Sequence, residues 1–144
     1  MQTLKKILRL SSRELTVLAQ AAVLLPAVRM ACGFVTFARL QRLSGCMARP
    51  SRANSLHPEA TARLVRIAAE HNVYRARCLE KSLVLRWILC RDGVDARIIL
   101  GARKEDKEMQ AHAWVEVDGL SLDDANDIHR PFSPFEKTAT SEAN

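Results

Sequence analysis

The stretch CLEKSLVLRWILCRDGVDARIILG, residues 78–101, changes its hydrophobic period part-way along, and this change decides the fold class. In its first part the apolar residues recur at the spacing of one helical stripe, and we predict a helix over about 78–91. The glycine of Arg-Asp-Gly, Gly93, suits a left-handed helix cap. The run 95–101 is extended and β-branched, so a strand follows. The stripe consists of Leu79, Leu83, Trp87 and Cys90.

Downstream, AHAWVEVDG at 111–119 alternates strictly between apolar and polar residues, which predicts a second strand. Asp118-Gly119 then turns the chain toward LSLDD, and RKEDKE at 103–108 is expected to be a charged loop. Helices followed by an antiparallel meander of at least three short strands make an α+β fold. The apolar side of the second strand holds Ala111, Ala113, Val115 and Val117, and the polar side holds His112, Trp114 and Glu116.

Upstream, LSSREL predicts a helix start, with Ser11 as the N-cap and Glu14 as its capping-box partner. We expect this helix to run to about Leu43 with a kink near Pro26, and Gly45 to end it. ARPSRANS at 48–55 is a polar linker. A further helix is predicted from about Pro58 to His71, and its apolar stripe holds Leu64, Ile67, Ala68 and His71.

The charge is divided unevenly along a chain whose size and composition suit one core. Residues 1–77 carry 13 Lys+Arg and 3 Asp+Glu (+10), whereas residues 78–144 carry 9 and 13 (−4). The first half is therefore expected to dock an acidic partner. A basic helical nucleic-acid-binding module is one alternative, although the sequence shows no nucleic-acid recognition motif and solvated helix faces explain the same charges.

An apolar stretch from Leu15 to Ala38 raises the question of a membrane span. Arg29 lies inside this stretch, and an arginine at the bilayer centre costs roughly 2.5–3.5 kcal/mol or more. Glu14 interrupts the basic-then-apolar order of a signal peptide. The cysteines have no CxxC spacing. We therefore expect a cytoplasmic protein with reduced thiols and no transmembrane segment.

Cys78 differs from the other cysteines in its position. At the first turn of a helix, unpaired backbone N–H groups and the positive end of the macrodipole favour a thiolate, and Arg75 and Arg77 add positive charge. Cys90 cannot pair with it, because twelve helical residues span about 18 Å and a disulfide needs Cα atoms within about 7 Å. Cys32, Cys46 and Cys90 are interpreted as core residues.

A nucleophilic thiol needs a base, and His112 is the histidine that falls within a strand. His57 and His71 lie at helix ends, where capping and solvated roles are common, and His129 lies in an irregular stretch. A three-residue turn places Asp124 on the face of His112. A two-residue turn places Asp123 there and pairs Val115 with Leu122 and Val117 with Leu120, which is the better apolar match. The residues alone leave this choice open.

Residues 77–124 resemble the transglutaminase-like cysteine peptidases of lasso-peptide biosynthesis, through the Cys-Leu helix start, DARIILG, HAWVEVDG and a following aspartate. The resemblance implies a transglutaminase/papain-like core, in which a Cys-bearing helix packs on a small antiparallel sheet. This core would occupy 56–135, after a helical N-terminal region at 1–47 and before a flexible tail at 136–144. The site residues implied are Cys78 as nucleophile, His112 as base and then acid, and Asp124 as the residue that orients the imidazole.

The activity that the resemblance implies is cleavage of the leader from a ribosomally made precursor through a thioester, without metal or cofactor. The implied partners are the precursor, a separate leader-binding protein and an ATP-dependent lasso cyclase. An acyltransferase or transglutaminase on the same three residues is the remaining alternative, because the triad does not specify the acceptor.

Overall fold

The computed structural model describes residues 10–43, 55–105, 108–122 and 133–134. Cys46, Asp123, Asp124, His129 and the predicted tail at 136–144 lie outside these ranges. The elements are α2 (Ser12–Phe34), α3 (Phe37–Leu43), α4 (Pro58–Glu70), α5 (Cys78–Arg91), β1 (Ala96–Glu105), β2 (Glu108–Val117), β3 (Leu120–Ser121) and β4 (Ser133–Pro134).

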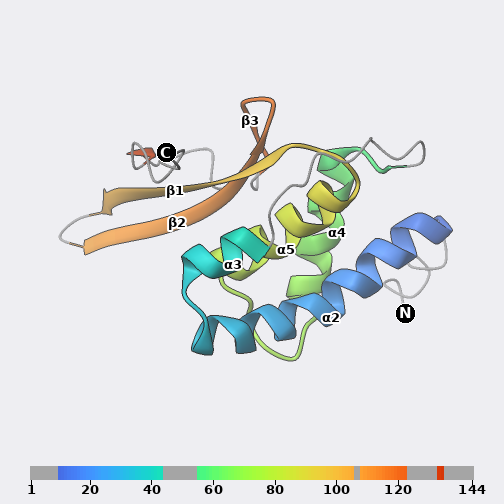
Figure 1. Ribbon diagram of the computed structural model, residues 1–144, viewed down its shortest axis with the longest axis horizontal. Coiled ribbons are helices and arrows are strands. Elements are labelled where there is room, and N and C mark those ends of the chain that lie inside the picture. Colours follow the sequence, from blue (N-terminus) through green and yellow to red (C-terminus); the bar gives the residue numbers. More distant parts are fainter. Residues whose placement is uncertain (1–9, 44–54, 106–107, 123–132, 135–144) are drawn as a thin grey trace.

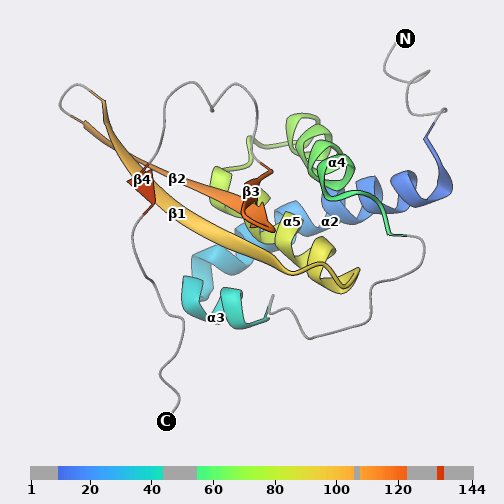
Figure 2. The same ribbon diagram turned by 90° about the horizontal axis from the view of Figure 1, so that it is seen from above.

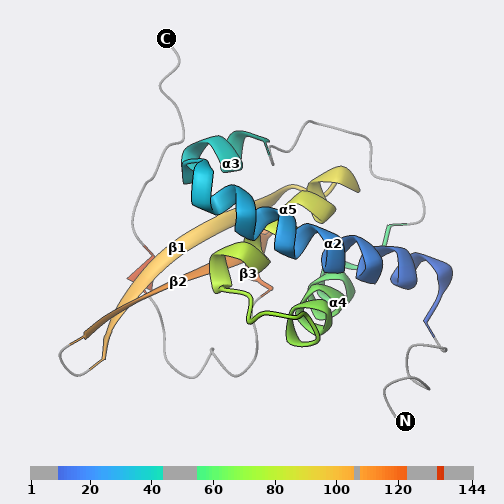
Figure 3. The ribbon, with the colours of Figure 1, turned by 90° about the horizontal axis from the view of Figure 1, so that it is seen from below.

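Helix α5 lies between the sheet and α2 in Figure 1, and Figure 2 shows from above the strands β1 and β2 passing over these helices. The described strands form an antiparallel sheet in the order β3-β2-β1-β4. Helices α2 and α4 pack on each other and on α5, and Figure 3 shows α2 crossing α5 with α4 beside it. The predicted α+β arrangement, with helices first and a small antiparallel sheet after them, is confirmed.

The bounds of α5 match the predicted helix, and Gly93 ends it with a φ of 85°. The main-chain N–H groups of Gly93 and Val94 donate to the carbonyls of Cys90 and Leu89. More than one face is buried, because α5 contacts both the sheet and the helices, so Leu79 and Trp87 of the predicted stripe are only half-buried. The expectation of reduced cysteines is wrong for Cys90, which is buried and disulfide-bonded.

The predicted capping box of α2 is present: the Ser11 main-chain N–H donates to Glu14 Oε2 at 2.8 Å, and the Glu14 N–H donates to Ser11 Oγ at 3.3 Å. The predicted length is wrong. The chain becomes extended at Val35, with φ −124° and ψ 136°, and α3 is a separate helix. Two successive β-branched residues, Val35 and Thr36, occupy this break.

Pro26 lies inside α2 and cannot donate to the carbonyl of Ala22, four residues earlier. The side-chain amide of Asn72, in the connection between α4 and α5, donates to that carbonyl at 3.5 Å. A residue fifty positions away therefore satisfies the group that the proline leaves without its helical partner.

One face of α2 is part of the same core as α4 and α5, through Val17, Ala21 and Leu25. By length and composition alone α2 could also cross a membrane, a test that the buried core helices of soluble proteins and N-terminal signal sequences pass as well. Two ion pairs join α2 to α5: Arg13 with Asp92 at the C-terminal end of α5, and Arg29 with Glu80 at its N-terminal end.

The predicted bounds of α4 hold to within one residue, but its buried face is rotated from the predicted stripe. Ile67 is half-buried and His71 is exposed. The rotation follows from the packing of α4 against both α2 and α5. Its buried residues are Thr61, Leu64, Val65, Ala68 and Ala69.

Strands β1 and β2 form a longer hairpin than the sequence predicts, pairing from Ala96↔Val117 to Glu105↔Glu108. The predicted charged loop at 103–108 is therefore wrong: its outer parts belong to the two strands, which extend beyond the helices (Figure 1). The predicted alternation of β2 is confirmed where α5 covers it, with Ala113, Val115 and Val117 buried.

Candidate active site

The first residue of α5 is Cys78, and its turn is fixed by a buried carboxylate. Glu80 is 5% exposed and accepts a hydrogen bond at 2.9 Å from the main-chain N–H of Arg77, which directly precedes the helix. Glu80 also lies 3.6 Å from the guanidinium of Arg29 on α2. These contacts hold the helix start that carries the thiol.

One turn along α5, the hydroxyl of Ser82 donates to the main-chain carbonyl of Ala113 on β2 at 3.0 Å. Ser82 is four residues from Cys78, and Ala113 follows His112, so this bond aligns the cysteine-bearing turn with the histidine-bearing strand. Sequence reasoning missed Ser82, because the bond joins residues 31 positions apart.

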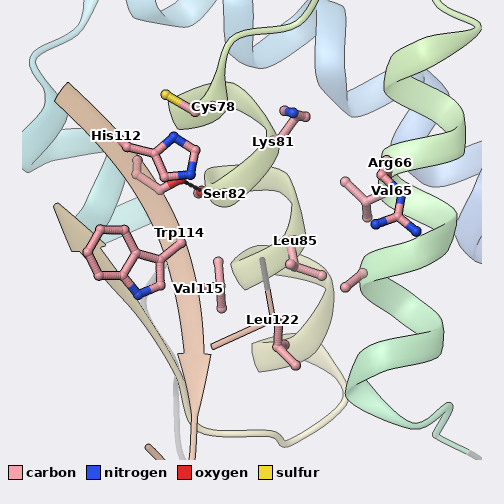
Figure 4. A pocket seen from close by; sticks show the side chains of 12 residues that line it. Val65, Arg66, Cys78, Lys81, Ser82, Leu85, His112, Trp114, Val115 and Leu122 are labelled. Carbon is pink, nitrogen blue, oxygen red and sulfur yellow. Dashed lines mark hydrogen bonds between the residues drawn. The ribbon is translucent and has the colours of Figure 1, made fainter. Parts of the chain in front are cut away.

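Cys78 and His112 line one cavity of about 50 Å³ between α4, α5 and β2. Figure 4 shows the imidazole of His112 beside the start of α5, where Cys78 lies, with Ser82 behind the ring. The cavity continues between the helices over apolar residues. The other lining residues are Ala62, Val65, Arg66, Lys81, Ser82, Leu85, Ala113, Trp114, Val115 and Leu122.

Trp114 and Glu116 have identifiable contacts beside His112, although the sequence suggested no role for them. The rings of His112 and Trp114 are stacked, with centroids 6.1 Å apart and planes inclined by 20°. The indole N–H of Trp114 donates to Glu116 Oε1 at 2.9 Å. Because these residues alternate along β2, their side chains share a face, and the indole restricts the imidazole from one side.

Two cationic side chains, Lys81 from α5 and Arg66 from α4, also line the cavity (Figure 4). Lys81 is three residues from Cys78, so the two lie on the same face of the helix. Positive charge near a nucleophile and near a developing oxyanion is a feature of acyl-transfer sites. The arrangement is a thiol, an imidazole and two cations around one small cavity.

The family model described as the transglutaminase-like superfamily matches residues 21–137, most of this chain. The chain belongs to the transglutaminase-like superfamily. The match begins within α2 and includes all of α4, α5 and the described sheet.

This transglutaminase-like chain is also similar to a curated relative, the microcin J25-processing protein McjB of Escherichia coli. The two are 32% identical over 62 residues, which cover 43% of this chain and 29% of McjB. The chain therefore matches less than a third of the length of that relative. The comparison with solved structures finds no significant match.

The turn after β2 has two residues in this superfamily member: Asp118 and Gly119 have φ values of 52° and 78°, and Val117 pairs with Leu120. The main-chain N–H of Leu122 donates to the carbonyl of Val115 at 2.8 Å. This is the turn that the apolar pattern favoured, in which Asp123 is predicted on the face of His112. Asp123 and Asp124 lie outside the described residues, so the orienting carboxylate stays a prediction.

The other described cysteine that is free, Cys32, differs from Cys78 in its surroundings. Burial raises the pKa of the Cys32 thiol, and the nearby carboxylate of Glu80 raises it further. His57 is exposed, and His71 contacts the Ile67 carbonyl at its own helix end. Among residues 10–43, 55–105, 108–122 and 133–134, no three His, Cys, Asp or Glu side chains form a metal-binding group.

Proposed function

We propose that this protein is a cysteine peptidase that separates the leader from a lasso-peptide precursor. The observation that carries the proposal is that Cys78, at a helix start, and His112, on the adjacent strand, line one cavity in a transglutaminase-like chain. The similarity to a microcin-processing protein supports a peptide substrate. The proposed catalytic core is 56–135, with 1–47 as its helical N-terminal region.

The proposed reaction has two steps. Cys78 transfers its proton to His112 and attacks the scissile carbonyl, and His112 then protonates the departing amine of the core peptide. A thioester joins the leader to Cys78. His112 next takes a proton from water, which attacks the thioester, and the leader leaves as a carboxylic acid while the thiol is restored. The main-chain N–H of Cys78 would donate to the oxyanion.

Asp124 is the proposed orienter of the imidazole, as the family resemblance implies. The observed two-residue turn supports Asp123 as the alternative residue for this orienting role. An orienting carboxylate accepts from one ring nitrogen and leaves the other free to exchange a proton with the thiol.

We further propose that the enzyme acts in the cytoplasm with a leader-binding protein, and that a lasso cyclase receives the released core peptide. The cavity beside Cys78 is small, at about 50 Å³, so it encloses only the residues next to the scissile bond. Recognition of the rest of the precursor is then the task of a partner. The basic N-terminal half suits such docking.

The test is to incubate the protein with a candidate lasso precursor and its leader-binding protein in heavy-oxygen water, and to identify the products by mass spectrometry. Hydrolysis gives two fragments whose masses sum to the precursor plus one water, with one heavy oxygen in the leader carboxyl. Cleavage that persists after Cys78→Ala or His112→Ala contradicts the mechanism. Transfer of the leader acyl group to an added amine would favour the acyltransferase alternative.

A further inference from the structure

A second, larger cavity of about 510 Å³ adjoins the cavity of Cys78 and His112. Arg66 and Lys81 line both cavities, so these two side chains lie at the boundary between them. The second cavity lies between the C-terminal half of α4, the connection 72–76 and the first turns of α5. The two cavities are therefore neighbours, and Cys78 lines the first of them.

The charge around this cavity is positive. Its lining contains Arg66, Arg75 and Lys81, against Glu70 as the carboxylate, so three positive charges and one negative charge sum to +2. Cations that line a concave surface attract and orient an anionic group more strongly than the same cations on a convex surface. The cavity therefore favours a ligand that carries a carboxylate.

The connection 72–76, which forms one wall of this cavity, is held to α2 at two places. In the connection 72–76, Asn72 donates to the Ala22 carbonyl of α2, and the guanidinium of Arg29 lies 4.7 Å from the ring centroid of Tyr74. Asn72 also accepts from the main-chain N–H of Val73 at 2.8 Å. Contacts that order a wall in this way reduce the entropy lost on binding.

We propose that this cationic cavity is the subsite for an acidic residue of the peptide substrate, on one side of the scissile bond and within three residues of it. The inference rests on the proposed function in taking a peptide as the ligand. Apolar lining residues such as Val73, Tyr74 and Ala76 favour a peptide over a small inorganic anion, because they can contact its backbone and neighbouring side chains.

The distance limit follows from helix and strand geometry. Lys81 lies three residues after Cys78, which is about 4.5 Å along the axis of α5 at ~1.5 Å per residue. An extended peptide advances about 3.3 Å per residue, so one or two residues span this rise, and a third residue extends to the neighbouring cations. A more distant acidic residue would lie beyond these cations.

The test uses thiol-alkylating peptides, so that it does not depend on cleavage. One pair, bromoacetyl-Gly-Asp-amide and bromoacetyl-Gly-Asn-amide, extends from Cys78 in one chain direction. A second pair, the chloromethyl ketones of acetyl-Asp-Gly and acetyl-Asn-Gly, extends in the other. In each case the sulfur displaces the halide and forms a thioether, and mass spectrometry gives the rate at Cys78, with Cys32 as the internal reference.

The expected result is that the Asp reagent of one pair alkylates Cys78 about three- to tenfold faster than its Asn counterpart, the size expected for a partly exposed ion pair. The pair of opposite direction should show no preference. Arg75→Glu should abolish or reverse the advantage, and Arg97→Glu, an equal charge change on β1 outside both cavities, should preserve it.

Equal rates for Asp and Asn in both directions would overturn the inference, and so would an advantage that survives Arg75→Glu. A preference that is lost equally in Arg75→Glu and Arg97→Glu would reflect net charge and also overturn it. A clear preference in a protein that does not cleave any lasso precursor would support the subsite and contradict the proposed function.

Discussion

The Ser82 hydroxyl and the Ala113 carbonyl form a 3.0 Å hydrogen bond between the helix that begins with Cys78 and the strand that carries His112. Both residues are buried, at 5% and 4% exposure. Removing one partner of a buried hydrogen bond leaves the other polar atom unsatisfied, which costs stability. This bond therefore controls how closely the start of α5 approaches β2.

Ser82→Ala should lower the free energy of unfolding by about 1–3 kcal/mol, because it leaves a buried carbonyl without its donor. The proposed cleavage should slow by about tenfold or more, since small displacements of reacting groups are costly. Chemical denaturation and kcat/KM measure the two effects. The control is Thr16→Ala, which removes an exposed hydroxyl bonded within α2 and should cost less than about 0.5 kcal/mol. Equal effects of both variants would contradict this role of Ser82.

Cys78→Ala should lower the rate of precursor cleavage by about 10⁴-fold or more, the scale seen when a covalent nucleophile is removed. Cys32→Ala is the matched control and should leave the rate within about twofold, because the raised pKa of Cys32 keeps it protonated. Initial rates of product formation measure both. A large loss with Cys32→Ala would indicate that the nucleophile was assigned wrongly.

The orienting carboxylate can be identified by comparing Asp123→Asn with Asp124→Asn. The variant at the orienting position should lower kcat by about 10²–10⁴-fold, because an asparagine no longer stabilises the imidazolium. The other variant should have a much smaller effect. The two-residue turn predicts the loss at Asp123, and the family resemblance predicts it at Asp124. Equal small effects would exclude both residues.

Arg13→Ala should destabilise the fold by about 1–3 kcal/mol, a figure reduced from that of a fully buried pair because the Arg13 side chain is 31% exposed. Asp92, whose side chain is 7% exposed, would be left as a buried charge without its cation. Arg97→Ala breaks an ion pair with Asp95 that is exposed on both sides and should cost less than about 0.5 kcal/mol. Urea denaturation compares the two, and similar losses would refute the structural role of Arg13.

The capping box makes the stability of the fold depend on pH in the acid range. The main-chain N–H of Ser11 and then its hydroxyl lower the pKa of Glu14 from its ordinary value of 4.5, so the folded protein binds that proton less readily than the unfolded chain. Its contribution is full above pH 4.5 and is lost as the pH falls through the lower folded pKa. Glu14→Gln should flatten thermal stability against pH in this acid range, and an unchanged slope would argue against the capping box as its source.

Elements with a local signal were predicted well from the sequence. The bounds of α5 and the covered part of β2 follow from apolar period and from the Asp-Gly and Arg-Asp-Gly turns. The predictions were wrong where contacts between residues far apart in the sequence determine the local structure. Charged residues at 103–105 join β1 because β2 pairs with them, and α2 continues through Pro26 with Asn72 donating to the carbonyl that the proline cannot reach.

The residues of the candidate site also fall into those that the sequence could predict and those that it could not. Cys78 and His112 could be found because a helix start and a strict alternation mark their positions. Ser82 could not be found, since its bond to Ala113 depends on how a helix docks on a sheet. The stacking of Trp114 on His112 could have been predicted from the sequence, because residues two apart on a strand share a face.

The two ion pairs from α2, through Arg13 and Arg29, lie at opposite ends of α5. Helix α2 therefore holds both ends of the helix that carries Cys78. Its apolar face is also part of the common core. A protease cut in the break at Val35–Thr36 would therefore leave two fragments that stay associated. Removal of residues 10–34 would take away Arg29, one of the contacts of Glu80 in the turn that carries the thiol.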